Sequence, residues 1–468
     1  MLFNSLTFLV FFPIVCTVYF ILPTTKYRNL FLLGASYFFY MNWEPAYALL
    51  ILTSTVITYG CGILVERNST RSKKKAFLTI SLILNLAILF LFKYYNFLGT
   101  SITAALHACG IAWQVPGLDI LLPVGISFYT FQAIGYTIDV YRGTLRAERN
   151  FFTYALFVSF FPQLVAGPIE RAKNLLPQFR DEHHAVDYDR IMAGLRMMLW
   201  GYFLKLCVAD RCGIDVDMVF NNVEHYNGTS FIITAVLFTF QIYGDFAGYS
   251  LIAIGAAKVM GFRLMENFHR PYFSTTVGEF WKRWHISLST WFMDYLYIPL
   301  GGNRVGRARH YFNLFVTFLV SGIWHGANWT FVAWGALHGI VLCIEKVIGI
   351  SKRQFSGFSK LLHWGITFVI VCFAWILFRA NNLDDAMTII SGIFTNIGRP
   401  KLDLANVMAD GMALSLLFIV EFLQEYGKGR RLLHPSSWVV RHLQMAALIA
   451  FILLFGVLGS DQFIYFQF

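Results

Sequence analysis

The chain has 468 residues, of which 57% are hydrophobic and only 13% are charged. Soluble globular proteins carry roughly 25% charged residues, so this composition excludes a soluble globular protein and indicates a polytopic membrane protein. The net charge of +11 comes from basic residues in short loops between apolar runs, a pattern typical of cytoplasmic anchors, and we predict no nucleic-acid binding.

Apolar runs long enough to be membrane segments recur along the whole chain, given that a span needs roughly 20 residues. They lie at about 5–22, 30–64, 76–98, 120–140, 151–167, 190–209, 229–257, 311–323, 329–345, 361–378, 408–426 and 442–458. The run 30–64 is interrupted by Asn-Trp-Glu-Pro at 42–45 and is interpreted as a hairpin of two short helices. We therefore predict an all-α protein with roughly eleven to thirteen membrane helices, some of them short or re-entrant.

No repeat, low-complexity tract or linker divides the chain, so residues 1–468 are predicted to form a single membrane-embedded domain. The apolar N-terminus is interpreted as a retained first span, because it lacks a basic start and a small-residue cleavage site. Seven single cysteines without a Cys-x-x-Cys pattern argue against a disulfide framework or a zinc site. We predict no metal and no bound cofactor.

Lysine and arginine cluster in a subset of the loops, which indicates the orientation of the chain. The clusters lie at 67–75, 142–149, 171–190, 258–309, 346–360 and 428–441. Loops rich in lysine and arginine face the cytoplasm, so these are predicted to be cytoplasmic. The acidic segment 210–224 and the loops near 100–118 and 459–468 would then face outward.

His325 is the leading candidate for a catalytic residue. With cytoplasmic ends near 309 and 346, two helical arms at about 1.5 Å per residue put it on the order of 20 Å from either end, deep in a hydrocarbon layer about 30 Å thick. Gly322, Gly326 and Asn328 argue against a continuous helix there. Broken backbone at such depth must be buried in protein or line a cavity, so an internal chamber is expected.

An ionisable side chain inside a membrane segment is a functional candidate by default, although a structural histidine is the alternative. Burial disfavours the imidazolium and keeps the ring in the neutral form that a general base needs. His325, flanked by Trp324, could take the proton of a hydroxyl group as that group attacks a thioester carbonyl.

The stretch 267–304 is too polar and aromatic for a plain span. His285 belongs either to an acyl chamber or to an interfacial helix anchored by tryptophans. Lys282, Arg283 and Arg304 could hold a phosphate-rich donor at a cytoplasmic mouth, or serve only as positive-inside anchors. Asp245, within the apolar run 229–257, lines the chamber or pairs with a buried cation; we favour a structural pair.

The same residues also bear on three other functional classes: haem proteins, transporters, and soluble hydrolases or NTPases. His325 and His338 resemble a haem-ligating pair, but the break after His325 and the lack of a second pair of helices with matching histidines argue against haem. A transporter that moves an acylated donor or a glycan without bond chemistry would be expected to show inverted repeats with paired broken helices, and only one strongly broken segment is found. His-Glu-x-x-His, Gly-x-Ser-x-Gly and P-loop patterns do not occur, which excludes soluble hydrolases and NTPases.

Several blocks together resemble the membrane-bound O-acyltransferase superfamily, and specifically its bacterial branch typified by the alginate O-acetyltransferase membrane subunit. They are PQLVAGPIER at 162–171, QIYGDFAGYS at 241–250, EFWKRWHISLSTWFMDYLYIPLGGNR at 279–304 and SGIWHGANWTFVAWGALHG at 321–339. The N-terminal MLFNSLTFLVFFPIV and the terminal FIYFQF also resemble that branch. The resemblance covers nearly the whole chain.

The resemblance implies that His325 is the essential histidine and that His285 is its partner in the tunnel. It implies a helical barrel around a central tunnel, with acetyl-CoA as a cytoplasmic donor and a periplasmic acetyltransferase or acceptor protein as partner. The protein would lie in the bacterial inner membrane, in contact with membrane lipid. Donor-binding or tunnel-lining candidates are Lys282, Arg283, Trp324, Asn328, Asp245 and Arg304.

The predicted function is therefore O-acetylation of an exported or cell-surface polysaccharide, of the alginate or cellulose type. Alginate, cellulose, peptidoglycan and teichoic-acid systems share these blocks, so a D-alanyltransferase for teichoic acid, fed by a carrier protein, stays open as an alternative.

Overall fold

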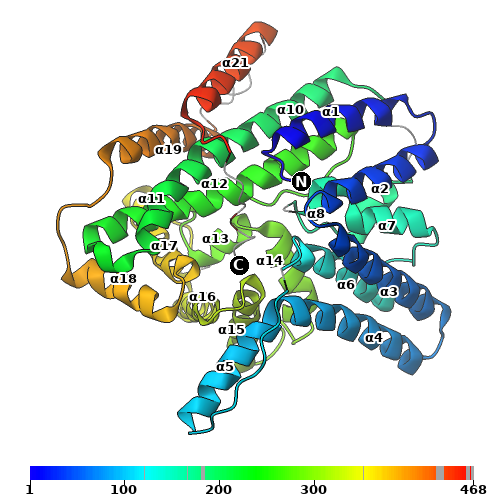
Figure 1. The fold of residues 1–468 in the computed structure, drawn as a ribbon, viewed down its shortest axis with the longest axis horizontal. Coiled ribbons are helices and arrows are strands. Elements are labelled where there is room, and N and C mark those ends of the chain that lie inside the picture. The colour runs from blue at the N-terminus through cyan, green and yellow to red at the C-terminus, as the bar shows by residue number, and fades with distance from the viewer. Residues whose placement is uncertain are drawn as a thin grey trace. The chain divides into compact units, whose positions relative to one another are not determined.

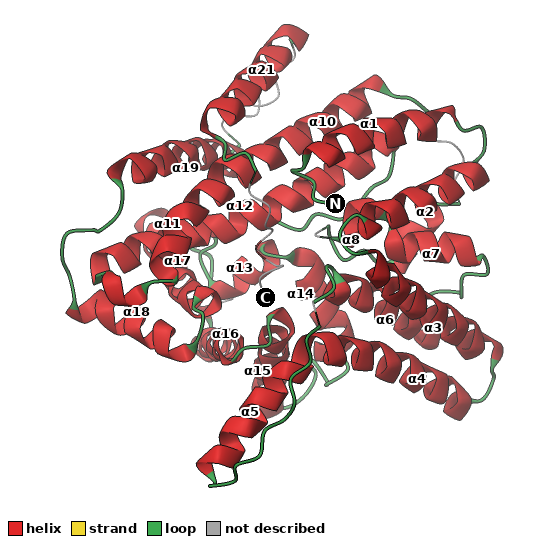
Figure 2. Cartoon of the chain, viewed as in Figure 1, coloured by secondary structure: helices red, strands yellow, loops and turns green. Residues whose placement is uncertain are grey.

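Helices account for all the regular secondary structure in the part of the chain that the computed structural model describes (Figures 1 and 2). That part comprises residues 1–120, 122–165, 167–180, 185–350, 353–427, 437–459 and 464. The prediction of an all-α protein is confirmed. The terminal block FIYFQF, apart from Ile464, and most of the basic cluster at 428–441 lie outside the described residues.

The described residues up to 203 form ten α-helices with short 3₁₀ and π segments among them. In order they are α1 (Leu6–Ile21), α2 (Thr25–Met41), η1 (Pro45–Tyr47), α3 (Ala48–Arg67), α4 (Arg71–Leu89), η2 (Phe90–Tyr94), α5 (Tyr95–Ala108), α6 (Ile126–Arg142), α7 (Phe151–Ser159), α8 (Phe161–Leu164), α9 (Ala172–Gln178) and α10 (Tyr188–Phe203).

The remaining described elements are again helical. They are η3 (Leu204–Ala209), α11 (Asp210–Phe220), η4 (Val223–His225), α12 (Gly228–Met260), η5 (Pro271–Phe273), α13 (Val277–Arg283), α14 (Ile286–Phe292), η6 (Met293–Tyr297), α15 (Arg307–His325), α16 (Trp329–Ile348), α17 (Gly357–Arg379), α18 (Leu383–Thr395), α19 (Leu404–Glu425) and α21 (Trp438–Phe455).

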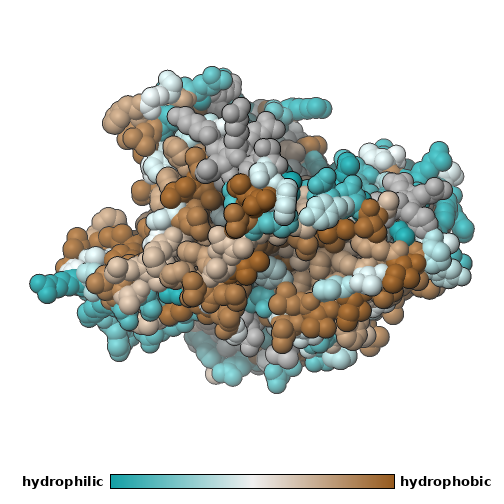
Figure 3. All heavy atoms as spheres, turned by 90° about the horizontal axis from the view of Figure 1, so that it is seen from above, coloured by the Kyte–Doolittle hydropathy of each residue, from teal (hydrophilic) through white to brown (hydrophobic). Residues whose placement is uncertain are grey.

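Eight helical segments among the described residues are long and apolar enough to cross a membrane. They are Pro45–Arg67, Arg71–Ala108, Tyr188–Phe220, Gly228–Met260, Trp329–Ile348, Gly357–Arg379, Leu404–Glu425 and Trp438–Phe455. Hydrophobic residues cover broad areas of the face shown in Figure 3, as expected where a surface contacts lipid. The protein is thus a multi-pass membrane protein, and the count of eleven to thirteen membrane helices stays a prediction.

Several apolar runs of the sequence form helices that are too short to span a membrane. The number of candidate spans is therefore smaller than the predicted number of membrane helices. The run 151–167 divides into α7 and α8 at Phe160, whose backbone is not helical. Conversely, one continuous helical segment includes the π-helical turn η2 and extends to Ala108, into a stretch that we predicted to be an outward loop. The amphipathic helix α18 was not predicted from the apolar runs.

Contacts between residues divide the chain into two compact units, one of residues 1–194 with 256–265 and the other of residues 195–255 with 266–468. The single-domain interpretation stays a prediction. In the first unit, α2 ends at Met41 and α3 begins at Ala48, so the predicted break at 42–45 is confirmed. Its core includes a cluster of aromatic rings to which Phe8, Phe39 and Phe161 belong.

The second unit contains the two candidate histidines. Its helices approach one another closely where glycines face each other: a Cβ atom on Gly248 of α12 would lie 2.8 Å from the carbonyl oxygen of Gly201 in α10. Small residues at such crossings allow membrane helices to pack by close backbone contact.

Candidate active site

A tight helical hairpin presents His325. Helix α15 ends at His325 and α16 begins at Trp329, which confirms the predicted break in the helix. Asn328 caps α16 by accepting a hydrogen bond from the backbone N–H of Thr330 at 3.1 Å. The two arms touch through glycines, since a Cβ atom on Gly322 would lie 2.4 Å from the carbonyl oxygen of Phe331. His325 is therefore the last residue of α15 and lies where the helical hydrogen bonds of the backbone stop.

The His325 side chain is buried among aromatic rings. Its own ring lies edge-on to Trp334 at 5.1 Å and to Phe378 at 5.5 Å between ring centroids. Trp334 in turn lies 4.9 Å from His338, whose Nδ1 accepts a hydrogen bond from the indole N–H of Trp281 at 3.3 Å. Aromatic walls of this kind exclude water and fix the ring plane of the histidine.

His285 lies between α13 and α14 in a left-handed backbone conformation, with φ of 44°. This conformation is uncommon for a residue other than glycine and points to a constraint from its surroundings. The constraint comes from Asn267, whose carbonyl oxygen accepts the N–H of Ile286 at 2.9 Å and whose side-chain Oδ1 lies 3.0 Å from Nδ1 of His285. The ring also packs edge-on against Phe246 at 4.5 Å.

The fold brings the two histidines together, with 6.4 Å between their ring centroids. His285 is 2% exposed and His325 is 6% exposed. Burial lowers the pKa of His285 well below its usual range, and the neighbouring His325 lowers it further. Both effects favour the neutral form of the His285 ring.

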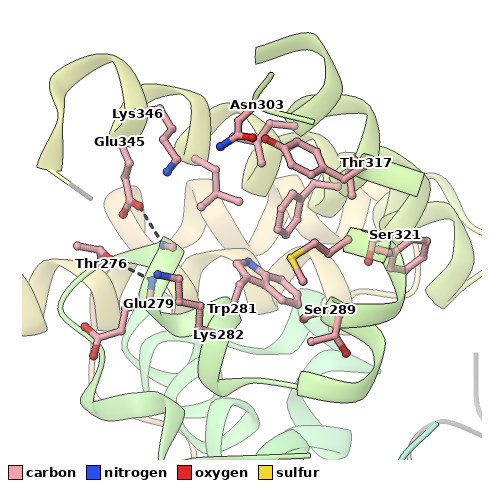
Figure 4. Close-up of a pocket in the computed structure, with 18 of the residues that line it drawn as sticks. Thr276, Glu279, Trp281, Lys282, Ser289, Asn303, Thr317, Ser321, Glu345 and Lys346 are labelled. Atoms are coloured by element: carbon pink, nitrogen blue, oxygen red, sulfur yellow. Dashed lines mark hydrogen bonds between the residues drawn. The ribbon is translucent and has the colours of Figure 1, made fainter. Parts of the chain in front are cut away.

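A cavity of about 660 Å³ extends alongside α13, α15 and α16 (Figure 4). Lys346, Arg353, His310 and Asn303 lie at one end, where Glu345 adds a carboxylate, and Lys282 and Glu279 also line the cavity. Ser321 lines the other end, one turn before His325 on the same face of α15. At 1.5 Å per residue the cavity follows α15 for about 16 Å, from its first turn to the turn that precedes His325. Ile286, which follows His285, also lines it.

The sequence-predicted donor residues lie in different surroundings. Lys282 is exposed and borders the cavity, whereas Arg304 is exposed and lies outside its lining. Arg283 pairs with Glu279 at 2.7 Å and with Glu425 at 2.9 Å. Burial acts to lower the pKa of Arg283, but its hydrogen bonds and ion pairs outweigh this and raise it.

Trp324 and Asn328 flank His325 in sequence. Trp324 is half-buried. The Asn328 side chain, besides capping α16, donates a hydrogen bond to the carbonyl oxygen of Asn381 at 2.8 Å.

Asp245 belongs to a separate buried ion cluster. Its carboxylate lies 2.7 Å from Nζ of Lys205, which also lies 2.8 Å from Asp210. Of the two alternatives left open for Asp245, the structure therefore shows the pair with a buried cation. Among the described residues, no group of three or more His, Cys, Asp and Glu side chains is arranged to hold a metal ion.

Sequence reasoning missed several residues around these sites. Asn267 gave no signal, because an asparagine in a loop before a polar helix is commonplace. Lys346 was counted only as part of a basic cluster, His310 lay just outside one and was not singled out, and Lys205 was hidden within an apolar run. Their cationic character was visible; their convergence on a cavity or a carboxylate was not.

Comparison with known proteins identifies the family. Residues 145–383 match the model of MBOAT, the membrane-bound O-acyltransferase family. "Probable alginate O-acetylase AlgI" of Pseudomonas syringae pv. tomato is 43% identical over 84% of this chain and 75% of its own length. "Peptidoglycan O-acetyltransferase" of Helicobacter pylori is 36% identical over 84% of this chain and 80% of its own length.

A more distant relative, "Teichoic acid D-alanyltransferase" of Bacillus subtilis, is 24% identical over 56% of this chain and 70% of its own length. The match to the family model covers half of the chain, and the similarity to the first two relatives covers most of it. This chain belongs to the membrane-bound O-acyltransferase family and is a multi-pass membrane acyltransferase.

Proposed function

We propose that the protein is an O-acetyltransferase of the bacterial inner membrane that acts in the O-acetylation of an exported or cell-surface polysaccharide. The observation that carries the proposal is the pair of buried histidines, His285 and His325. Neither lines the cavity itself, but Ile286, next to His285, and Ser321, one turn before His325, do. The two relatives named as O-acetylating enzymes of alginate and peptidoglycan support acetyl as the transferred group.

In this mechanism His325 acts as the general base. It takes the proton of the attacking hydroxyl group as the hydroxyl oxygen forms a bond to the acyl carbon. The carbon–sulfur bond of a thioester donor then breaks, and the proton passes to the leaving thiolate. Proton transfer by a positioned side chain contributes about 10²–10⁴-fold to a rate. His285 orients or polarises the reacting groups.

The cavity would receive the donor, which we propose to be acetyl-CoA. Its volume of about 660 Å³ lies in the range of small-molecule sites. Lys282, Lys346 and Arg353 contribute cationic groups to its lining, and such groups suit the phosphates of coenzyme A. By the loop charges, the start of α15 and the end of α16, where Lys346 lies and which Arg353 follows, face the cytoplasm, where the donor is made.

On this orientation the acyl group would pass outward to a periplasmic acetyltransferase or acceptor protein. We propose that the membrane helices enclose the passage as a barrel around a central tunnel. Trp324, Asn328 and Asp245 stay lower-ranked tunnel-lining candidates, and Arg283 and Arg304 stay lower-ranked donor-binding candidates. D-alanyl transfer from a carrier protein is the second candidate, favoured only by the distant similarity to the teichoic-acid enzyme.

The test uses purified protein in lipid nanodiscs with radiolabelled acetyl-CoA. The parent is expected to hydrolyse or transfer the acetyl group, and the His325→Ala variant is expected to lose this activity while inserting and folding normally. Full activity in a correctly folded His325→Ala variant would refute the proposed role. If neither protein turns over, adding a periplasmic partner and a carrier-bound D-alanyl donor separates a missing acceptor from a wrong donor.

A further inference from the structure

We propose that Asn267 fixes the tautomer of His285, so that the neutral ring keeps its proton on Nδ1 and offers Nε2 only as a hydrogen-bond acceptor. Asn267 would then be a positioning residue for the acyl-transfer site. The catalytic meaning of this inference rests on the proposed function, whereas the tautomer itself rests only on the hydrogen bonds around Asn267.

The first step identifies which end of the Asn267 amide faces His285. The backbone N–H of Ser287 lies 3.3 Å from the same amide atom, and the Ser287 hydroxyl lies 2.9 Å from it. A backbone N–H can only donate, so the atom that it reaches is the carbonyl oxygen. The amide nitrogen points the other way and donates to the hydroxyl oxygen of Ser250 at 3.1 Å. Reversing the amide would set its NH₂ group against the N–H of Ser287.

The second step assigns the proton on His285. Its Nδ1 lies 3.0 Å from Oδ1 of Asn267, an oxygen that can only accept. Nδ1 must therefore carry the proton. A neutral imidazole has one N–H, so Nε2 has none and holds a lone pair.

The third step establishes that the ring is neutral. The ring is buried, with Phe246 of α12 and Asn267 and Phe268 of the preceding segment around it. Among the described residues, His325 is a titratable group that faces it from another helix, and its presence disfavours a positive charge on His285. Burial and this neighbour both keep His285 in the one-proton form.

Asn267 also holds the backbone that aims the ring. Its carbonyl oxygen accepts the N–H of Ile286 at 2.9 Å, directly after the left-handed His285. The backbone N–H of His269 donates to the carbonyl oxygen of Arg283 at 2.9 Å, which is a second hydrogen bond between the segment of Asn267 and the segment of His285. Side chain and main chain of one asparagine thus define both the direction and the protonation of the ring.

This tautomer narrows the role of His285. To polarise an acyl carbonyl, His285 would have to donate a hydrogen bond, but its only N–H is used by Asn267. His285 therefore acts by accepting a hydrogen bond. It cannot accept from the attacking hydroxyl while that group gives its proton to His325, because a hydroxyl group has only one proton to donate. Stabilising the carbonyl oxygen falls to other donors of the site.

Solid-state NMR of the full protein in bilayers, with ¹⁵N-labelled histidine, tests the tautomer directly. The chain has 12 histidines, and the signals lost in a folded His285→Gln variant identify the ring of interest. We expect a protonated Nδ1 and an unprotonated Nε2 in the parent, and a mixture of tautomers in Asn267→Leu. A parent ring protonated on Nε2 would overturn the inference. The NMR signal does not depend on enzyme turnover, so it tests the tautomer of His285 even if the proposed function is wrong.

Kinetics with acetyl-CoA then test whether the tautomer matters. Asn267→Leu should lower kcat by about 10²-fold, the low end of the contribution of a positioned proton acceptor, with KM changed little. Asn267→Asp keeps an acceptor for Nδ1–H but adds a charge that favours the imidazolium, so the acidic limb of the pH–rate profile should move to higher pH.

Asn85→Asp is the matched control, because Asn85 is also a buried amide that accepts a serine hydroxyl, at 2.5 Å, but lies in the first unit. It should leave the pH–rate profile where it is, although its stability can fall. Retention of kcat within twofold in Asn267→Leu, or a parental profile in Asn267→Asp, would reject the positioning role and leave Asn267 a structural residue.

Discussion

Among the buried polar groups of the second unit, the cluster around Lys205 and the cluster around His285 balance charge in opposite ways. Lys205 lies between Asp210 and Asp245, at 2.8 Å and 2.7 Å from their carboxylate oxygens. His285 instead makes its described hydrogen bond to a neutral amide, and the ring beside it is another histidine. One cluster holds permanent ions; the other holds groups that can be neutral.

The difference follows from the cost of burying charge. An ionised group in a low-dielectric interior needs an opposite charge at contact distance, and the pair then holds its members in place. A general base must instead start neutral and become charged during the reaction. A carboxylate bound tightly to either histidine would favour its imidazolium. We infer that the ion cluster serves the fold and that the neutral cluster serves the chemistry.

The largest expected effect is on the rate of acyl transfer, when a histidine of the neutral cluster is removed. His325→Ala should reduce acyl transfer by about 10²–10⁴-fold or more, because proton transfer in the transition state is lost. Its midpoint of thermal unfolding should stay close to that of the parent. His442→Ala, which removes an exposed histidine of α21, is the control and should change neither quantity. Equal loss in both variants would contradict the assignment.

The next largest expected effect is on stability, when the cation of the ion cluster is removed. Lys205→Met leaves two buried carboxylates without their cation and should destabilise the protein by about 3–5 kcal/mol. Unfolding of the protein in detergent measures this. Asp245→Asn should cost less, because Lys205 and Asp210 then remain a neutral pair. Lys173→Met, at an exposed position, is the control. If Lys205→Met unfolds like the control, the cluster does not stabilise the fold.

A smaller effect concerns the hairpin that carries His325. Gly335→Ala places a Cβ atom 2.6 Å from the carbonyl oxygen of Phe318, so α15 and α16 must separate. The expected cost is about 1–3 kcal/mol, with lower kcat as His325 shifts. Gly365→Ala in α17 meets nothing within 4 Å and should be neutral or stabilising, since alanine favours a helix. Matching effects in the two variants would argue against the close packing.

The smallest effect concerns the cationic end of the cavity. Lys346→Gln should raise KM for acetyl-CoA by about two- to fivefold, since an exposed ion pair contributes roughly 0.2–1 kcal/mol. The difference from the parent should shrink at high salt. Arg309→Gln removes the same charge from an exposed residue outside the cavity lining and should leave KM nearly unchanged. An equal rise in both variants would indicate a general effect of net charge.

The sequence alone predicted the features that depend on neighbouring residues. Apolar runs indicated helices, and the glycines and asparagine around His325 indicated the break that ends α15 and begins α16. Both are local: a helix needs a run of suitable residues, and a break needs residues that leave the helical backbone. The expected membrane depth of His325 followed from loop charges at either end.

Only the tertiary structure decided which side chains meet. The family resemblance implied that His285 is the partner of His325, and the structure shows the two rings facing each other. Nothing in the order of residues indicates that Asn267 sets the ring of His285 or that Lys205 is the cation that reaches Asp245. Each contact joins residues from separate segments, and it depends on how the helices rotate and cross. Helices that are apolar on every side show only a weak hydrophobic periodicity, so the sequence pattern does not fix their rotation. Packing at the glycine contacts and the pairing of buried polar groups fix it instead.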